Sequence, residues 1–282
     1  ATSTRRLNLA QSFNPMGSLL GMYVAMNFIQ NRLNPMDTME RSQLSDTEFA
    51  AVRDSDLMVL IAPYLIIGLV ILAMLIVIRM VKMPKNGDQS HNINFLPTLK
   101  RIFGIHHYRE GVIAQFFYVG AQIMCWTFII QYGTRYFMSE GMEEKAAEVL
   151  SQQYNIVAMI IFCASRFICT FILRYLSPGL LLKVLAIVAC LVGVSACMSL
   201  MFPTIYGIAL QGLGDDAKFG AAGLIMAILG GSVLPPLQAS IIDCHTLLGM
   251  PAVNLSFILP FICFVVIVIY GHRSYCREKM RK

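Results

Sequence analysis

The sequence predicts an all-α polytopic membrane protein with about seven to eight transmembrane helices. Its 282 residues are 57% apolar and only 13% charged, and the mean hydropathy is +0.65, far from the balance of a soluble domain. The apolar residues gather in charge-free runs, most of them long enough to cross about 30 Å of hydrocarbon. These runs are Leu7–Asn31, Leu57–Ile78, Gly111–Thr134, Val149–Ser165 with its continuation past Arg166 to Leu173, Val184–Gly214, Phe219–Ile242 and Thr246–Gly271.

The first predicted span carries a stripe of polar side chains. Leu7–Asn31 is 25 residues long, and a helix over these residues places its polar residues on one face. Lipid cannot satisfy amides, so this face must contact protein or water. The residues of the stripe are Asn8, Gln11, Asn14 and Ser18.

Charges in the loops predict the orientation of the spans. Residues 31–56 carry more acidic than basic side chains, whereas residues 79–110 and the tail 272–282 are mainly basic. The positive-inside rule then places the second loop and the C-terminus in the cytoplasm. This topology accounts for the net charge of +6, so the partner that it indicates is the lipid bilayer and not a nucleic acid.

The long basic loop divides the chain into two helical groups. A polar run over 84–91 predicts a flexible linker, and residues 95–103 predict a short amphipathic helix on the membrane face. The predicted parts are therefore 1–80, the cytoplasmic linker 81–109, and 110–282. Because the chain starts without Met and enters a span at once, we expect it to be the interior of a longer polypeptide.

Several segments, in order along the chain, carry a family resemblance. They are RLNLAQSFNP with the following Gly17 and Ser18, Ala114–Gln122 with Trp126, the Ser165-Arg166-Phe167 turn, Met201–Gly207 through Gly214, and Phe219–Ala222 leading to Met226–Gly231. This pattern resembles the L-fucose:proton symporter family of the major facilitator superfamily. The resemblance implies part of a twelve-helix fold, from helix 5 to the C-terminus.

The same resemblance implies a function. A family member would be a secondary active transporter, not an enzyme, that imports a monosaccharide with protons by alternating access across the bacterial inner membrane. The sugar would be L-fucose or a hexose such as glucose or galactose. No cofactor is implied. A seven-span receptor or a non-sugar carrier remains the alternative.

Two features depart from the family pattern. The first four helices are missing, and with them the family's proton-coupling carboxylates; Asp56 and Asp243 lie only at span ends. In addition, family members place two helices where Leu180–Gly214 offers 35 residues, and two spans need about 40. Either one long helix bends near Pro203, or two short or re-entrant helices keep the tail cytoplasmic. We expect the second arrangement.

Sugar recognition requires hydrogen-bonding groups and an aromatic surface. Gln11 and Asn14 match family positions that contact or orient sugar, although they could instead join helices. Gln115, Tyr118, Gln122 and Trp126 fall on one face of the third span. The predicted binding residues are Gln11, Asn14, Gln115, Gln122, Trp126, Phe162 and Phe202, with packing as the alternative role of the aromatic ones.

Arg166 is the one cation deep in an apolar run. Its expected role is at a cytoplasmic gate or in setting topology, with snorkelling from the helix end as the alternative. The eight cysteines lack paired spacing and companion histidine ligands, so we expect them to pack in the core and to hold no metal.

Overall fold

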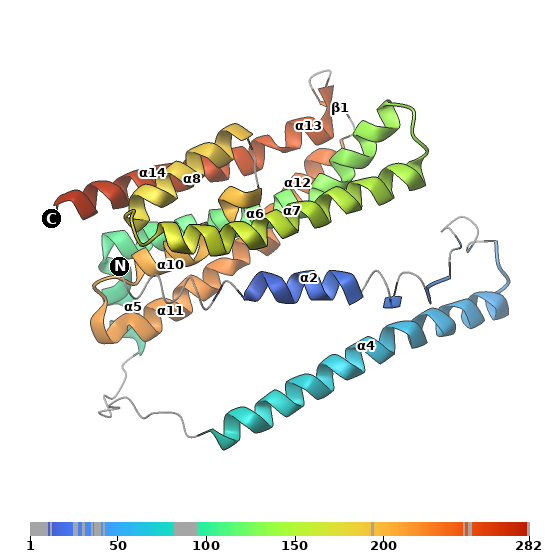
Figure 1. The fold of residues 1–282 in the computed structure, drawn as a ribbon, viewed down its shortest axis with the longest axis horizontal. Coiled ribbons are helices and arrows are strands. Elements are labelled where there is room, and N and C mark those ends of the chain that lie inside the picture. Colours follow the sequence, from blue (N-terminus) through green and yellow to red (C-terminus); the bar gives the residue numbers. More distant parts are fainter. Residues whose placement is uncertain are drawn as a thin grey trace. The chain divides into compact units, whose positions relative to one another are not determined.

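The structure is a computed structural model, and it describes residues 11, 13–24, 28–29, 32–34, 36, 41, 43–81, 95–192, 195–244, 246–247 and 250–280. The start of the first predicted span and the polar run at 84–91 of the predicted linker lie outside this set. The chain divides into two compact units (Figure 1): Ala1–Gly17 with Ile93–Lys282, and Ser18–Asn92. Helix α2 (Asn14–Val24) crosses from one to the other. The predicted boundaries at 80 and 110 stay a prediction.

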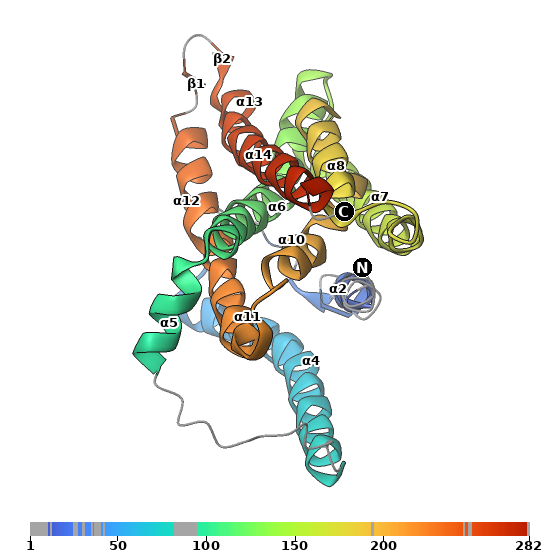
Figure 2. The same ribbon diagram turned by 90° about the vertical axis from the view of Figure 1, so that its left-hand side faces the viewer.

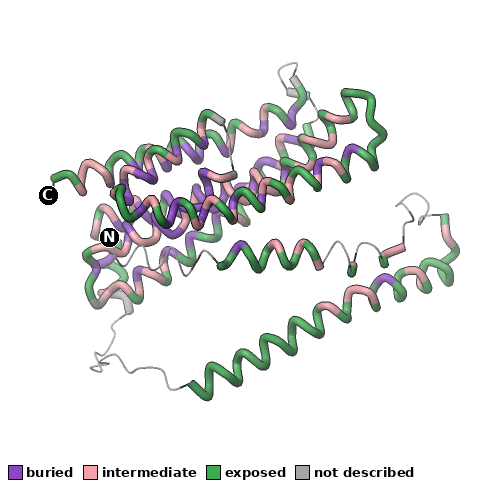
Figure 3. The backbone as a smooth tube through the Cα atoms, viewed as in Figure 1, coloured by how far each residue is buried: buried purple, intermediate pink, exposed green. Residues whose placement is uncertain are grey.

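The smaller unit contains one long helix, α4 (Asp46–Met80). Ser45 and Glu48 form a capping box that satisfies backbone N–H groups at its start. Near the first turns, the buried Asp56 accepts a hydrogen bond from the Asn34 N–H at 2.9 Å and pairs with Arg41 at 2.9 Å. Beyond Asp56 the apolar residues are exposed around the helix (Figure 3), as in a helix surrounded by lipid.

The larger unit is built around α6 (His106–Ser139). This helix contacts α7 (Glu144–Ile172), α10 (Met201–Ala209), α12 (Gly230–Ile242) and α14 (Ile258–Met280), and it lies between α10, α12 and α14 in Figure 2. Its buried side chains form the main core with residues of these neighbours. The remaining elements are α5 (Phe95–Gly104), α8 (Pro178–Val192), α9 (Ser195–Met198), η3 (Gly214–Asp216), α11 (Ala217–Met226), η4 (Ala227–Leu229), the two-residue strands β1 (Thr246–Leu247) and β2 (Met250–Pro251), and α13 (Ala252–Ser256).

Glycines set the separation of α6 and α12. A Cβ added to Gly120 would overlap the Leu234 side chain, and one added to Gly230 would overlap the carbonyl oxygen of Phe116. At these two points the backbone of one helix lies directly against a side chain or the backbone of the other. Such close approach lets membrane helices gain van der Waals contact, since lipid provides no hydrophobic driving force between them.

Two short helices occupy Leu180–Gly214, the region for which the sequence allowed either one bent helix or two short ones. Gly179, at the start of α8, donates its backbone N–H to Glu278 near the end of α14 at 3.2 Å. Gln211, just after α10, accepts a hydrogen bond on its backbone carbonyl oxygen from Nε2 of His107, in the first turn of α6, at 2.8 Å. The start of α8 and the end of α10 therefore lie at the end of the bundle where α6 begins. The segment between them runs away from this end and back, which confirms the prediction of two short helices.

Apolar helices dominate the described part of the chain. Five are long and apolar enough to cross a membrane, and two shorter ones, Pro178–Leu191 and Ala196–Ala209, accompany them. The helix predicted over 95–103 is present as α5, and its Arg101 forms a two-pronged ion pair with Asp216 at 2.5 and 2.8 Å. Hydrogen bonds to that carboxylate raise the pKa of Arg101 above its ordinary value.

Candidate functional site

Three predicted site residues meet where α6 faces α7. Phe162 and Arg166 lie four residues apart and therefore on one side of α7. The Arg166 guanidinium lies 5.5 Å from the centre of the Phe162 ring, and that ring meets Trp126 edge-on with centroids 5.0 Å apart. Arg166 is only 4% exposed, so its contact with the ring is largely desolvated and correspondingly stronger than at a surface.

The segment before α2 contacts the same helix. Arg166 donates from Nη1 to the backbone carbonyl of Gln11 at 3.1 Å, and Phe13 meets Phe167 edge-on at 5.9 Å. The structure thus brings Gln11 to the group through its backbone. Asn14 is the first residue of α2, and its side chain is exposed.

A second aromatic group follows α6 toward α10. The Tyr118 hydroxyl donates to the Met198 carbonyl at 2.7 Å, and the Tyr118 ring meets Phe202 at 6.3 Å. Phe202 in turn stacks on Tyr206 at 6.4 Å. Tyr118 is fully buried and therefore packs in the core, whereas Phe202 is only partly buried and keeps part of its ring accessible.

Buried polar atoms without a hydrogen-bond partner occur on α6, α7 and α10, the helices that carry these aromatic residues. Among the described residues they include both amide atoms of Gln115, the indole nitrogen of Trp126, Nε of Arg166 and the Thr204 hydroxyl. A buried polar group without a partner costs about 1–3 kcal/mol, and native proteins rarely leave several together. A ligand with several hydroxyl groups, or bound water, would satisfy them. Gln122 is partly buried.

The contacts that hold α7 in place were missed by sequence reasoning. Ser165 donates its hydroxyl to the Ala196 carbonyl at 2.8 Å, and Ser199 donates to Ser165 at 3.2 Å. Ser165, Arg166 and Phe167 lie inside α7, so their placement in a turn was wrong. A serine one residue before a buried arginine was the available signal, since both must find partners inside the span.

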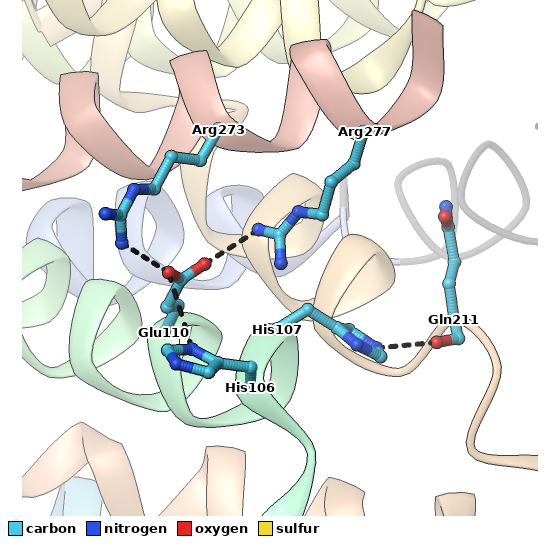
Figure 4. A network of polar contacts seen from close by, with 6 residues as sticks. All are labelled: His106, His107, Glu110, Gln211, Arg273 and Arg277. Atoms are coloured by element: carbon cyan, nitrogen blue, oxygen red, sulfur yellow. Dashed lines mark hydrogen bonds and ion pairs between the residues drawn. The ribbon is translucent and has the colours of Figure 1, made fainter. Parts of the chain in front are cut away.

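A charge network joins the start of α6 to the end of α14 (Figure 4). The carboxylate of Glu110 accepts from Arg273 at 2.5 Å and from Arg277 at 2.8 Å, and His106 Nδ1 lies 3.8 Å away. The sequence places all four residues near span ends but gives no indication that they meet. This network joins the start of α6 to the end of α14 at one end of the bundle.

Solved structures identify the class of fold. No model of a known protein family matches the chain. A crystal structure of the major facilitator superfamily transporter FucP in the outward conformation aligns with a TM-score of 0.79 at 28% identity, over 96% of this chain and 68% of that one. A variant of the Escherichia coli fucose:proton symporter FucP aligns with a TM-score of 0.75 at 26% identity, over the same shares. The fold is therefore a partial major facilitator superfamily fold, as the sequence predicts.

Curated relatives narrow the class to a family. The L-fucose-proton symporter of Haemophilus influenzae is 45% identical over 97% of this chain and 68% of its own length. The L-fucose-proton symporter of Escherichia coli is 29% identical over 94% of this chain and 63% of its length, and a glucose/galactose transporter of Brucella abortus is 26% identical over 96% and 63%. The chain belongs to the L-fucose:proton symporter family, whose members are multi-pass membrane transporters and not enzymes. It spans about two thirds of the length of these relatives.

Proposed function

We propose that this chain takes part in the import of a monosaccharide together with protons, by alternating access across the bacterial inner membrane, with its C-terminus in the cytoplasm. The sugar is L-fucose or a hexose such as glucose or galactose, as the names of the relatives suggest. The observation that carries the proposal is the set of unpartnered buried polar atoms on α6, α7 and α10, the helices that also carry the aromatic rings of Trp126, Phe162 and Phe202.

Each part of that set has a role in sugar binding. A glutamine amide offers a donor and an acceptor to neighbouring hydroxyls, which suits Gln115, with Gln11, Asn14 and Gln122 completing the polar side. The apolar C–H face of a sugar ring packs on aromatic rings, which suits Trp126, Phe162 and Phe202. Phe162 is 2% exposed, so it supports Trp126 from behind and contributes less surface of its own.

Arg166 is proposed as a gating residue. Its Nη1 bonds the backbone of Gln11, which lies in the predicted N-terminal group, whereas Arg166 itself belongs to α7 of the C-terminal group. Alternating access moves such groups against each other, so this hydrogen bond would have to break and reform in each cycle. A charge-assisted bond of this kind is worth about 1.5–3 kcal/mol, enough to bias a two-state equilibrium without locking it.

Uptake by cells lacking their own fucose and galactose carriers tests the proposal. Cells producing the full-length protein should accumulate labelled L-fucose or D-galactose when the outside is acidic, and a protonophore should abolish accumulation. Trp126→Ala should remove most uptake, while Trp126→Phe should retain part of it because a ring still covers the sugar face. Absence of uptake for every monosaccharide, with normal amounts of protein in the membrane, would refute the proposal.

A further inference from the structure

A cavity of about 390 Å³ opens at the end of the larger unit where α6 and α8 begin and α7, α10 and α14 end. This volume falls within the range of roughly 300–1,000 Å³ that is typical of ligand pockets. The cavity is lined by polar and charged side chains from separate elements, which are His107, Arg174, Ser177, Ser274, Arg277 and Glu278. It lies apart from the sugar site proposed around Trp126.

Most of the charges at the cavity already have partners. Arg277 bonds Glu110 at 2.8 Å, Glu278 accepts the N–H of Gly179 at 3.2 Å, and His107 bonds the Gln211 carbonyl at 2.8 Å. The Arg174 guanidinium has no partner among the described residues and is exposed at the rim. An anion entering the cavity would therefore meet the unpaired Arg174 and also Arg277, which Glu110 neutralises only in part.

Arg174 indicates the chemical class of the ligand. An arginine guanidinium can donate two parallel hydrogen bonds to phosphate oxygens, and such charge-assisted bonds are stronger than neutral ones. Ser274 also lines the cavity, but it is 2% exposed and its hydroxyl pairs with the Tyr270 hydroxyl one turn earlier on α14, so Arg174 is the group left for a ligand.

The charge balance and the rim select the kind of phosphate. Arg174, Arg273 and Arg277 against Glu110 and Glu278 leave an excess of one positive charge, which matches a phosphodiester better than a phosphate dianion. Beside Arg174, Tyr175 is 82% exposed and Phe171 66% exposed, and exposed aromatic side chains at a span end mark the level of lipid headgroups. Basic pockets between helices at this level bind phospholipid headgroups.

We propose that this cavity binds the phosphodiester of a phospholipid headgroup, held by Arg174 with Arg277 beside it. The bound lipid would join the α7–α8 turn to α14, and through Arg277 and Glu110 to the start of α6. This site does not depend on which sugar the protein carries.

The test titrates the purified full-length protein in detergent with phosphatidylglycerol and counts bound lipids by native mass spectrometry. Arg174→Gln should weaken the tightest lipid site by about tenfold or more, since a charge-assisted contact is lost. Arg109→Gln is the matched control, an exposed arginine at the start of α6 that does not line the cavity.

Three results would overturn the inference. Equal weakening by Arg174→Gln and Arg109→Gln would mean diffuse attraction to a basic surface. Equally tight binding of diacylglycerol, which lacks the phosphate, would mean an apolar contact. Displacement of the lipid by inorganic phosphate at the lipid's own concentration would assign the cavity to free phosphate instead of a headgroup.

Discussion

Replacing Gln115 with leucine separates a binding role from a structural one. Gln115 is fully buried on α6, and neither of its amide atoms has a partner. Leucine is similar in size and removes both atoms without leaving another group unpaired, so the free energy of unfolding should stay the same or rise by about 1 kcal/mol. If the amide binds a sugar hydroxyl, the same change should weaken sugar binding by about 1.4 kcal/mol or more, a tenfold loss in affinity.

Gln238 provides the matched control. It is also fully buried and its Oε1 has no partner, but unlike Gln115 its Nε2 donates to the Ser256 hydroxyl at 3.1 Å, and that hydroxyl donates to the Val253 carbonyl at 2.7 Å. Gln238→Leu should therefore lower stability by about 1–2 kcal/mol and leave sugar affinity unchanged. Thermal unfolding and calorimetric titration of the full-length protein with L-fucose measure both quantities. A loss of stability in Gln115→Leu with unchanged affinity would show that Gln115 is structural and refute the reasoning.

Three further predictions concern packing, topology and coupling. Gly230→Ala should destabilise the protein by about 1–3 kcal/mol, because the new Cβ would overlap the Phe116 carbonyl oxygen; an unchanged thermal midpoint would contradict this contact. A cysteine at Met280, which is 79% exposed, in a background without native cysteines should react with an impermeant maleimide only after the cells are opened; labelling of intact cells would place the tail outside. The 282-residue chain alone in liposomes should not take up protons with sugar, because Asp56, the one buried carboxylate among the described residues, is held by Arg41 and the Asn34 N–H; alkalinisation of the medium on adding L-fucose would disprove it.

Properties that depend on short stretches of chain were predictable. Apolar runs predict spans because unpaired backbone groups and charges are costly in lipid, and this cost applies to each segment separately. The length of Leu180–Gly214 allowed either one bent helix or two short ones, and the basic tail favoured two short helices through the positive-inside rule. The stripe of Gln115, Tyr118 and Trp126 followed from helical periodicity alone. Asn8, which the same argument places with Gln11, lies outside the described residues.

Which of these side chains have partners was decided only by the tertiary structure. Arg166 reaches the Gln11 carbonyl across 155 positions of sequence, and Tyr118 finds the Met198 carbonyl across 80, whereas Gln115 on the same stripe finds no partner. Periodicity places residues on a face, but the helix opposite that face, and its distance, depend on glycine contacts such as that between Gly230 and Phe116. The sequence by itself therefore determined the spans and the candidate residues. The packing of distant helices determined which polar groups are left for a ligand, because hydrogen bonds require donor and acceptor within about 3 Å.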